Sequence, residues 1–215
     1  MKALILVDLQ NDFCKNGALE VKNGDETISV ANSLINKFSQ ENSLILATKD
    51  WHPSSHKSFA INSNGTIGEI GTLNGIPQVW WPVHCVENTK GSEFHPNLNK
   101  ELISTIIYKG TNPEIDSYSG FFDNGRLNET TLNSILKENK IDTLYILGLA
   151  TDFCVKFTVL DALQLGYKVY LVEDGCRGVN LEADSSTKAI EEMKNCGATI
   201  VKSIDLLWSI IWRRC

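Results

Sequence analysis

Short apolar runs alternate along the chain with segments in which apolar residues recur every three to four positions. Six runs have the length and composition of buried strands, at residues 3–7, 43–48, 102–108, 144–147, 168–172 and 198–201. Helical spacing between them predicts helices over residues 25–38, 127–138, 154–165 and 183–196. This alternation of strand and helix predicts an α/β fold with a mostly parallel sheet. Because there is no internal repeat and no linker, we expect a single domain over residues 1–215.

Two segments do not follow this alternation. Residues 61–78 are rich in Gly, Asn and Ser and show no periodicity, which predicts a long surface insertion. Residues 206–215 form an apolar tail with two tryptophans and a basic end. The tail is too short to span a bilayer, which takes about 20 apolar residues. We expect it to pack as a helix on the body of the protein or on a neighbouring subunit, with an amphipathic helix at a membrane surface as the alternative.

The composition argues against several classes of partner. The chain has 215 residues and a net charge of −6, and it lacks a basic stripe that would follow a phosphate backbone, so we expect no nucleic-acid partner. The first apolar run is short and ends in Asp8, unlike a secretory signal, and no segment is long enough to span a membrane. The six cysteines show no close-paired spacing. We therefore expect reduced thiols and a cytoplasmic location.

Chemically active side chains follow three of the predicted strands. Asp8 comes directly after the first strand, Lys109 after the third, and Cys154 lies in the segment 148–155 after the fourth. Because the carboxyl ends of parallel strands lie at one edge of a sheet, these side chains can meet. An acid that takes the thiol proton and a cation that holds the thiolate make a nucleophilic set. The alternatives are a turn-forming Asp8, a solvated Lys109 and a buried structural Cys154.

Cys154 is expected in the first turn of a helix, because Val155, Val159 and Ala162 recur at helical spacing after it. The free N–H groups and the dipole of a helix N-terminus favour an anion, and they lower the pKa of a thiol placed there. We therefore expect a reactive thiolate at this position.

A second set of side chains has the composition of a metal site. Asp50 and His52 are two residues apart after the second strand, so in extended chain both point the same way. A carboxylate and an imidazole suit a divalent transition metal. His56 and His84 follow, so three of the four histidines lie between residues 52 and 84. The pair by itself does not decide between a metal site and ordinary loop residues.

The chain resembles the nicotinamidases, within the isochorismatase-like cysteine hydrolases. The matching motifs run in family order between residue 3 and about residue 201, at residues 8–13, 48–53, 56–59, 81–85, 109–110, 116–121 and 148–155. The Asp, Lys and Cys set alone would indicate only the superfamily, whereas the stretch with its histidines is specific to nicotinamidases. The resemblance implies a three-layer αβα fold with a six-stranded, mostly parallel sheet.

The resemblance also implies roles for individual residues. Asp8, Lys109 and Cys154 would be the catalytic triad, and Asp50, His52 and His84 would bind one divalent ion, zinc or alternatively iron or manganese. His56 matches a position that binds metal only in some relatives. A cis peptide between Leu149 and Ala150 would turn the Ala150 N–H toward that of Cys154 to form an oxyanion hole. Phe13 and Trp81 would sandwich the substrate ring, with Tyr118 nearby.

The implied activity is hydrolysis of nicotinamide, and of pyrazinamide, to the acid and ammonia, as in pyridine nucleotide salvage. Three alternatives stay open at this point: a metal-free relative acting on isochorismate or on a carbamoyl or ureido amide, a non-catalytic protein that binds a small aromatic amide, and a thiol redox sensor. A redox sensor would need a resolving cysteine, and none lies close to Cys154 in the sequence. The implied partner is therefore a small molecule, and a homo-oligomer is a further option.

Overall fold

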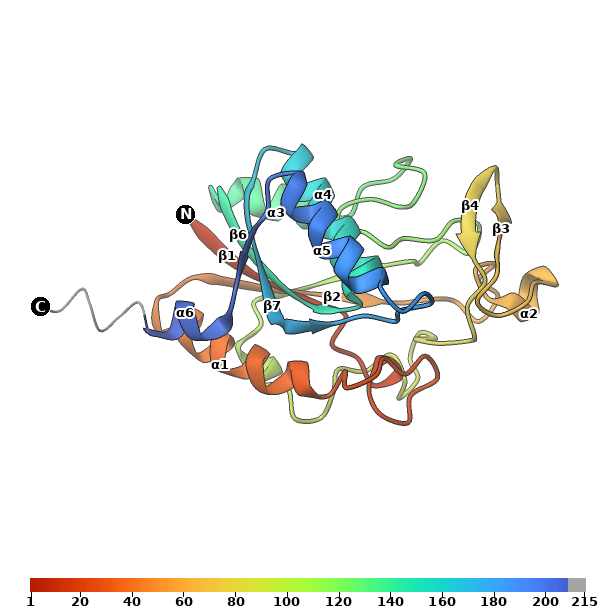
Figure 1. Cartoon of the computed structure of the whole chain (residues 1–215), viewed down its shortest axis with the longest axis horizontal. Helices are drawn as coiled ribbons and strands as arrows, with labels where there is room; N and C mark the ends of the chain where they lie inside the picture. The colour runs from red at the N-terminus through yellow and green to blue at the C-terminus, as the bar shows by residue number, and fades with distance from the viewer. Residues whose placement is uncertain (209–215) are drawn as a thin grey trace, which may run out of the picture.

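The computed structural model describes residues 1–208, and its centre is one parallel six-stranded sheet (Figure 1). The strand order is β5-β2-β1-β6-β7-β8, and every neighbouring pair is parallel. The strands are β1 Lys2–Val7, β2 Leu44–Asp50, β5 Thr105–Lys109, β6 Thr143–Leu149, β7 Lys168–Arg177 and β8 Thr199–Val201. The predicted α/β fold is confirmed, and so is the six-stranded sheet implied by the resemblance.

Helices cover both faces of this sheet. On one face lie α1 (Glu26–Gln40) and α6 (Ser203–Trp208), and on the other lie α3 (Leu132–Glu138), α4 (Lys156–Gln164) and α5 (Ser185–Asn195) (Figure 1). Residues 3–7 of β1 are completely buried, as expected for a central strand covered on both faces. The apolar stripe of α1, which includes Leu34 and Ile35, is buried as well. These layers are those of the expected αβα architecture.

The strand order determines where the chemistry lies. β5, β2, β1 and β6 are adjacent, so the carboxyl ends of these four strands form one continuous edge. Asp50 ends β2 and Lys109 ends β5, and the two residues stand opposite each other in the parallel register. Asp8 follows β1, between β2 and β6. Side chains far apart in the sequence are therefore gathered at this edge.

The segment 61–78, predicted as a surface insertion, contains regular structure that its composition did not predict. A short helix, α2 (Ala60–Ser63), leads into an antiparallel hairpin of β3 (Ile70–Leu73) and β4 (Ile76–Val79). The hairpin turns at Asn74 and Gly75, which both have positive φ. Asn-Gly is the preferred pair for a tight two-residue hairpin turn, because both positions need the left-handed region. That dipeptide between two short apolar runs is the signal that could have predicted the hairpin.

Three predicted boundaries also move by three residues or more. β5 begins at Thr105 because residues 100–102 form a 3₁₀ turn, and α3 begins at Leu132 because the chain before it folds back, with Thr130 N–H donating to Phe121 O. β7 continues to Arg177, since after an irregularity in register it pairs with β6 again. None of these shifts moves a candidate site residue off the end of its strand.

The apolar tail is only partly described. Residues 206–208 belong to α6, which packs against α1 and β7, and residues 209–215 lie outside the described residues. The packing of α6 on the body agrees with the expectation for the first part of the tail. Within residues 1–208, no helix is both long and apolar enough to cross a membrane.

Candidate active site

Three side chains from separate strand ends meet at the carboxyl edge of the sheet. Lys109 ends β5, Asp8 follows β1, and Cys154 lies after β6 in η3 (Thr151–Val155), which is a π-helical turn. Lys109 Nζ lies 2.8 Å from Asp8 Oδ2 and 3.4 Å from Cys154 Sγ. The three residues are between 0% and 6% exposed. An acid, an ammonium and a thiol therefore lie within reach of one another in a site largely closed to water.

Lys109 also connects this triad to a second cluster. Its ammonium donates to Asp50 Oδ1 at 2.5 Å and to the Ser117 carbonyl at 3.0 Å. One buried cation is thus shared by the carboxylates of Asp8 and Asp50, and its donors are all in use. Asp8 is further held by Thr48, whose hydroxyl donates to Asp8 Oδ1 at 2.5 Å. The carboxylate of Asp8 therefore has a fixed orientation toward Lys109.

Burial decides which of these groups is charged. Burial raises the pKa of Asp8 above its ordinary value, although the neighbouring Lys109 ammonium opposes the rise. Burial alone would lower the pKa of Lys109, but the Asp50 and Asp8 carboxylates hold that pKa well above its ordinary value. Lys109 therefore stays protonated, and Asp8 is a stronger base than an exposed carboxylate.

The thiol of Cys154 differs from the sequence-based expectation. Burial raises its pKa well above the ordinary value; Lys109 opposes this rise, whereas Asp8 and Asp50 add to it. The expected lowering by the helix N-terminus is wrong because desolvation of the sulfur outweighs it. The resting sulfur is a thiol, so nucleophilic attack requires a base to take its proton. A carboxylate oxygen of Asp8 and the sulfur of Cys154 lie within 4.8 Å of each other, so Asp8 is close enough to accept this proton.

Gly148 allows the loop that carries Cys154 to leave the sheet beside β1. Its φ is +135°, and a Cβ at this position would lie 2.1 Å from the carbonyl oxygen of Val7. No side chain can be accommodated there without separating β6 from β1. The next peptide, between Leu149 and Ala150, is cis, in agreement with the resemblance.

Replacing Gly148 with alanine should therefore destabilise the protein more than the same change at an unobstructed glycine. Gly166 is the matched control, because its φ is +91° and a Cβ there meets no atom within 4 Å. We expect Gly148→Ala to lower the free energy of unfolding by about 2 kcal/mol more than Gly166→Ala, since overpacking is added to backbone strain. Urea denaturation of the two variants measures this difference, and equal losses would contradict the steric argument.

Asp50, His52 and His84 form the second cluster. Asp50 Oδ2 lies 3.6 Å from His52 Nε2 and 3.7 Å from His84 Nε2. The Nδ1 atom of each ring lies 2.8 Å from a backbone carbonyl, that of Gly110 for His52 and that of Pro82 for His84. A carbonyl only accepts, so Nδ1 carries the proton and the Nε2 lone pairs face Asp50. Two imidazole nitrogens and a carboxylate oxygen around one point suit a divalent transition metal.

Two side chains that the sequence analysis did not assign hold this cluster in place. The Gln10 side-chain amide donates to Asp50 O at 2.8 Å and accepts from Asp50 N at 2.9 Å. Asp12 Oδ2 accepts from the N–H of Cys85, the residue after His84, at 2.7 Å. Both belong to the motif 8–13, but only contacts between distant segments reveal what they do.

His56 lies beside this cluster rather than within it. Its Nδ1 lies 2.7 Å from Ser58 Oγ, and its Nε2 is buried and has no hydrogen-bond partner among the described residues. His56 groups with His52 and Asp116, whereas Asp50, His52 and His84 form their own group. The structure therefore does not bring His56 together with the other three residues around one point.

A small cavity opens onto both clusters. Phe13, Trp81 and Tyr118 line it, as do Ala150 and Cys154. The structure thus brings together all the residues that the resemblance assigned to the substrate and the oxyanion hole. The cavity is also lined by residues that had no assigned role, namely Leu19, Asp116, Phe153 and Val179.

Phe153 completes the aromatic wall of this cavity. Its ring centroid lies 4.9 Å from that of Trp81 and 5.4 Å from that of Tyr118, both in edge-to-face geometry. Phe153 precedes Cys154 in the motif, so its neighbourhood was visible in the sequence, whereas its contacts with residues 81 and 118 were not. Flat walls of this kind suit a planar aromatic ligand.

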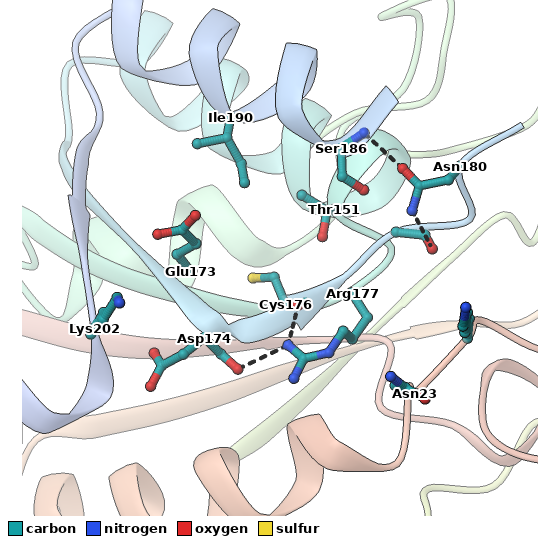
Figure 2. A pocket seen from close by; sticks show the side chains of 12 residues that line it. Asn23, Thr151, Glu173, Asp174, Cys176, Arg177, Asn180, Ser186, Ile190 and Lys202 are labelled. Carbon is teal, nitrogen blue, oxygen red and sulfur yellow. Dashed lines mark hydrogen bonds between the residues drawn. The ribbon is translucent and has the colours of Figure 1, made fainter. Parts of the chain in front are cut away.

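Figure 2 shows a different and larger pocket, which contains none of the predicted site residues. Its most prominent cation, Arg177, donates to the carbonyls of Asp174 and Cys176, as the dashed lines in Figure 2 show. Arg177 also forms an ion pair with Glu26 at 2.6 Å. The guanidinium of Arg177 is therefore already paired, and the smaller cavity is the one that holds Asp50, His84 and Cys154.

Comparison with known proteins shows which family the chain resembles. The isochorismatase domain model matches residues 2–205. A nicotinamidase of Escherichia coli is 51% identical over 95% of this chain and 96% of its own length. A solved nicotinamidase/pyrazinamidase of Acinetobacter baumanii superposes with a TM-score of 0.90 at 41% identity, covering 95% of this chain and 97% of that one. A Pyrococcus horikoshii pyrazinamidase solved in complex with zinc gives a TM-score of 0.78 at 40% identity, covering 94% and 98%.

Proposed function

The chain belongs to the isochorismatase family, and we infer from this premise that it is a nicotinamidase, an amidohydrolase that converts nicotinamide to nicotinate and ammonia. The observation that carries the inference is that the Asp50, His52 and His84 cluster opens onto the same aromatic-walled cavity as the Asp8, Lys109 and Cys154 triad. A metal-independent relative would have no need for the cluster of Asp50, His52 and His84. The likeness to proteins that are also named pyrazinamidases supports pyrazinamide as a second substrate.

We assign Asp50, His52 and His84 as the residues that hold one divalent ion. Their chemistry fits, because both Nε2 lone pairs and a carboxylate oxygen face one point, and Gly110 and Pro82 fix the ring tautomers. The zinc complex of the Pyrococcus horikoshii pyrazinamidase supports zinc as that ion. When bound, the ion supplies a Lewis-acidic position that accepts the pyridine nitrogen of the substrate and thereby orients its carboxamide.

The aromatic walls place the substrate over the thiol. Phe13 and Trp81 hold the two faces of the pyridine ring, and Tyr118 and Phe153 limit its movement at the side. The carboxamide then lies at Cys154, near the reactive sulfur. Such positioning replaces a bimolecular encounter with a unimolecular step and accounts for a large part of the rate.

The triad carries out the acyl transfer. Asp8 takes the Cys154 proton, and the sulfur attacks the carboxamide carbon to form a tetrahedral adduct whose oxyanion accepts hydrogen bonds from the N–H groups of Ala150 and Cys154. Asp8 returns its proton to the amide nitrogen. Ammonia then departs, and the acyl group remains bound to the sulfur as a thioester. Asp8 next takes a proton from water, which attacks the thioester, and nicotinate departs as the proton returns to sulfur. Lys109 remains charged throughout and offsets the negative charge on Asp8 and on sulfur.

Removing the metal should mainly weaken substrate binding. After treatment with a chelator, we expect the KM for nicotinamide to rise at least about ten-fold, because the ring loses its orienting contact while the triad remains in place. His52→Ala should have the same effect on KM. Ammonia release measured with and without chelator, together with metal content, checks both. Full activity in the metal-free protein would contradict the assignment and favour a metal-independent hydrolase of another small amide.

A non-catalytic binding protein is the second candidate. It would need the cavity but not the buried triad, and an acid, an ammonium and a thiol are costly to bury without a chemical use. We also propose a cytoplasmic location, which the free thiols support: the cysteines among residues 1–208 form no disulfide.

A further inference from the structure

The β3–β4 hairpin is the part of the chain to which the proposed function assigns no role. Among the described residues, its strands pair only with each other, and Ile70 on β3 is 74% exposed. Gln78 on β4 is different, because it is polar and only 3% exposed. A buried amide needs partners, so the contacts of Gln78 show what this side of the hairpin does.

The Gln78 side chain donates hydrogen bonds to two residues that line the substrate cavity. Its Nε2 lies 2.9 Å from Asp116 Oδ2 and 3.2 Å from Tyr118 Oη, and a third acceptor, Val79 O, is at 2.8 Å. A carboxylate and a carbonyl only accept, so the nitrogen of the amide must be the atom that faces them. The orientation of the Gln78 amide is therefore determined by its partners.

Tyr118 joins this contact to the aromatic wall. Trp81 Nε1, which can only donate, lies 3.2 Å from the same Tyr118 oxygen. The Tyr118 oxygen thus accepts hydrogen bonds from Gln78 on the hairpin and from Trp81. Loss of either donor would free the phenol ring to move relative to the ring of Trp81.

Asp116 depends on the same amide. Its carboxylate is 3% exposed, and its oxygens accept from Ser117 N at 2.8 Å and from Gln78 Nε2. A buried carboxyl group that loses a hydrogen-bond donor must move or take up water. Either change would alter the cavity at the position of Asp116.

Gln78 does not itself line the cavity. It lines the neighbouring surface groove, together with Ile70 and Val79, so it lies behind the cavity wall. Any effect of Gln78 on the reaction must therefore pass through Tyr118 and Asp116.

We propose that Gln78 is a positioning residue, through which the β3–β4 hairpin holds Tyr118 and Asp116 in place and so sets the affinity for the aromatic amide. This inference rests on the proposed function. It also assigns a role to the segment 61–78: the hairpin supports the wall of the pocket from outside and leaves the chemical step to the triad.

The test compares kinetic constants for nicotinamide in matched variants. Gln78→Met keeps the volume but removes the donor, and we expect KM to rise about ten-fold with kcat within about two-fold of wild type. Thr72→Val, on an exposed position of β3, is the control and should leave both constants unchanged. Metal content and thermal unfolding are measured on each protein. If Gln78→Met does not fold, Gln78→Asn, which is one methylene too short to reach both partners, serves in its place.

A double-mutant cycle separates positioning from a merely structural role. If Gln78 acts through the Tyr118 hydroxyl, Gln78→Met combined with Tyr118→Phe should raise KM by less than the product of the two single effects. An unchanged KM in Gln78→Met, multiplicative effects in the cycle, or a fall in kcat that follows lost metal would each overturn the inference while wild-type turnover upholds the proposed function. Absence of nicotinamide turnover by the wild type would overturn both.

Discussion

Replacing Cys154 with alanine should reduce ammonia release from nicotinamide by at least about 10⁴-fold while the protein stays folded. Cys154 carries the only thiol among the described side chains that line the cavity, and neither Asp8 nor Lys109 can form the thioester in its place. The substitution removes one buried atom and should cost only about 1 kcal/mol of stability. Initial rates, circular dichroism and metal content of the purified variant check the prediction.

Cys176 supplies the matched control for this experiment. Its thiol is also buried, with a pKa raised by burial to about 12, but it lines the separate pocket of Figure 2. Cys176→Ala should therefore keep wild-type kinetics. Appreciable turnover by Cys154→Ala, or an equal loss in both variants, would show that residue 154 is not the nucleophile.

Replacing Lys109 with methionine should have the second largest effect, because it leaves two buried carboxylates without their cation. Asp8 and Asp50 are at most 4% exposed, and both contact the Lys109 ammonium. Removing one partner of a buried ion pair typically costs about 3–5 kcal/mol. We expect a loss in this range from urea denaturation at a fixed metal concentration, together with a fall in turnover of at least about 100-fold.

Lys49 supplies the control for the Lys109 substitution. Lys49 directly precedes Asp50 on β2 and is 8% exposed. Its ammonium, however, lies over the rings of Phe94 and Trp51, at 4.5 Å and 5.2 Å from their centroids. Lys49→Met keeps an apolar side chain against these rings and should cost no more than about 1 kcal/mol. Similar losses of stability in the two variants would mean that Lys109 does not neutralise the buried carboxylates.

The strands and the edge at which they end were predictable because their signals are local. A continuous apolar run such as residues 3–7 is typical of a strand buried on both faces, and a polar residue directly after it must lie at the carboxyl edge. The hairpin within the segment 61–78 was not predicted, for an equally local reason. Its turn signal, Asn74-Gly75, is two residues long and lies among other Gly and Asn residues, so composition concealed it.

The protonation state of Cys154 could not be predicted from its position before a helix. That position predicts a lowered pKa, but the pKa depends on the complete surroundings of the sulfur, and these come from β1, β2 and β5. His56 is a similar case: it does group with His52, as their spacing suggests, but the third member of that group is Asp116 rather than Asp50 or His84. Nothing in the sequence predicted the role of Gln78, because its partners Asp116 and Tyr118 lie about 40 residues away along the chain.

The sequence by itself determined the α/β class, the strand ends that carry Asp8, Lys109 and Cys154, and the motifs that identify the family, because each of these depends on residues that are close together in the chain. Only the tertiary structure decided that one ammonium serves both carboxylates, that the thiol is protonated at rest, and that a hairpin supports the pocket wall. Charge states and hydrogen-bond partners in a buried site depend on desolvation and on distances between segments, and those quantities exist only once the chain has folded.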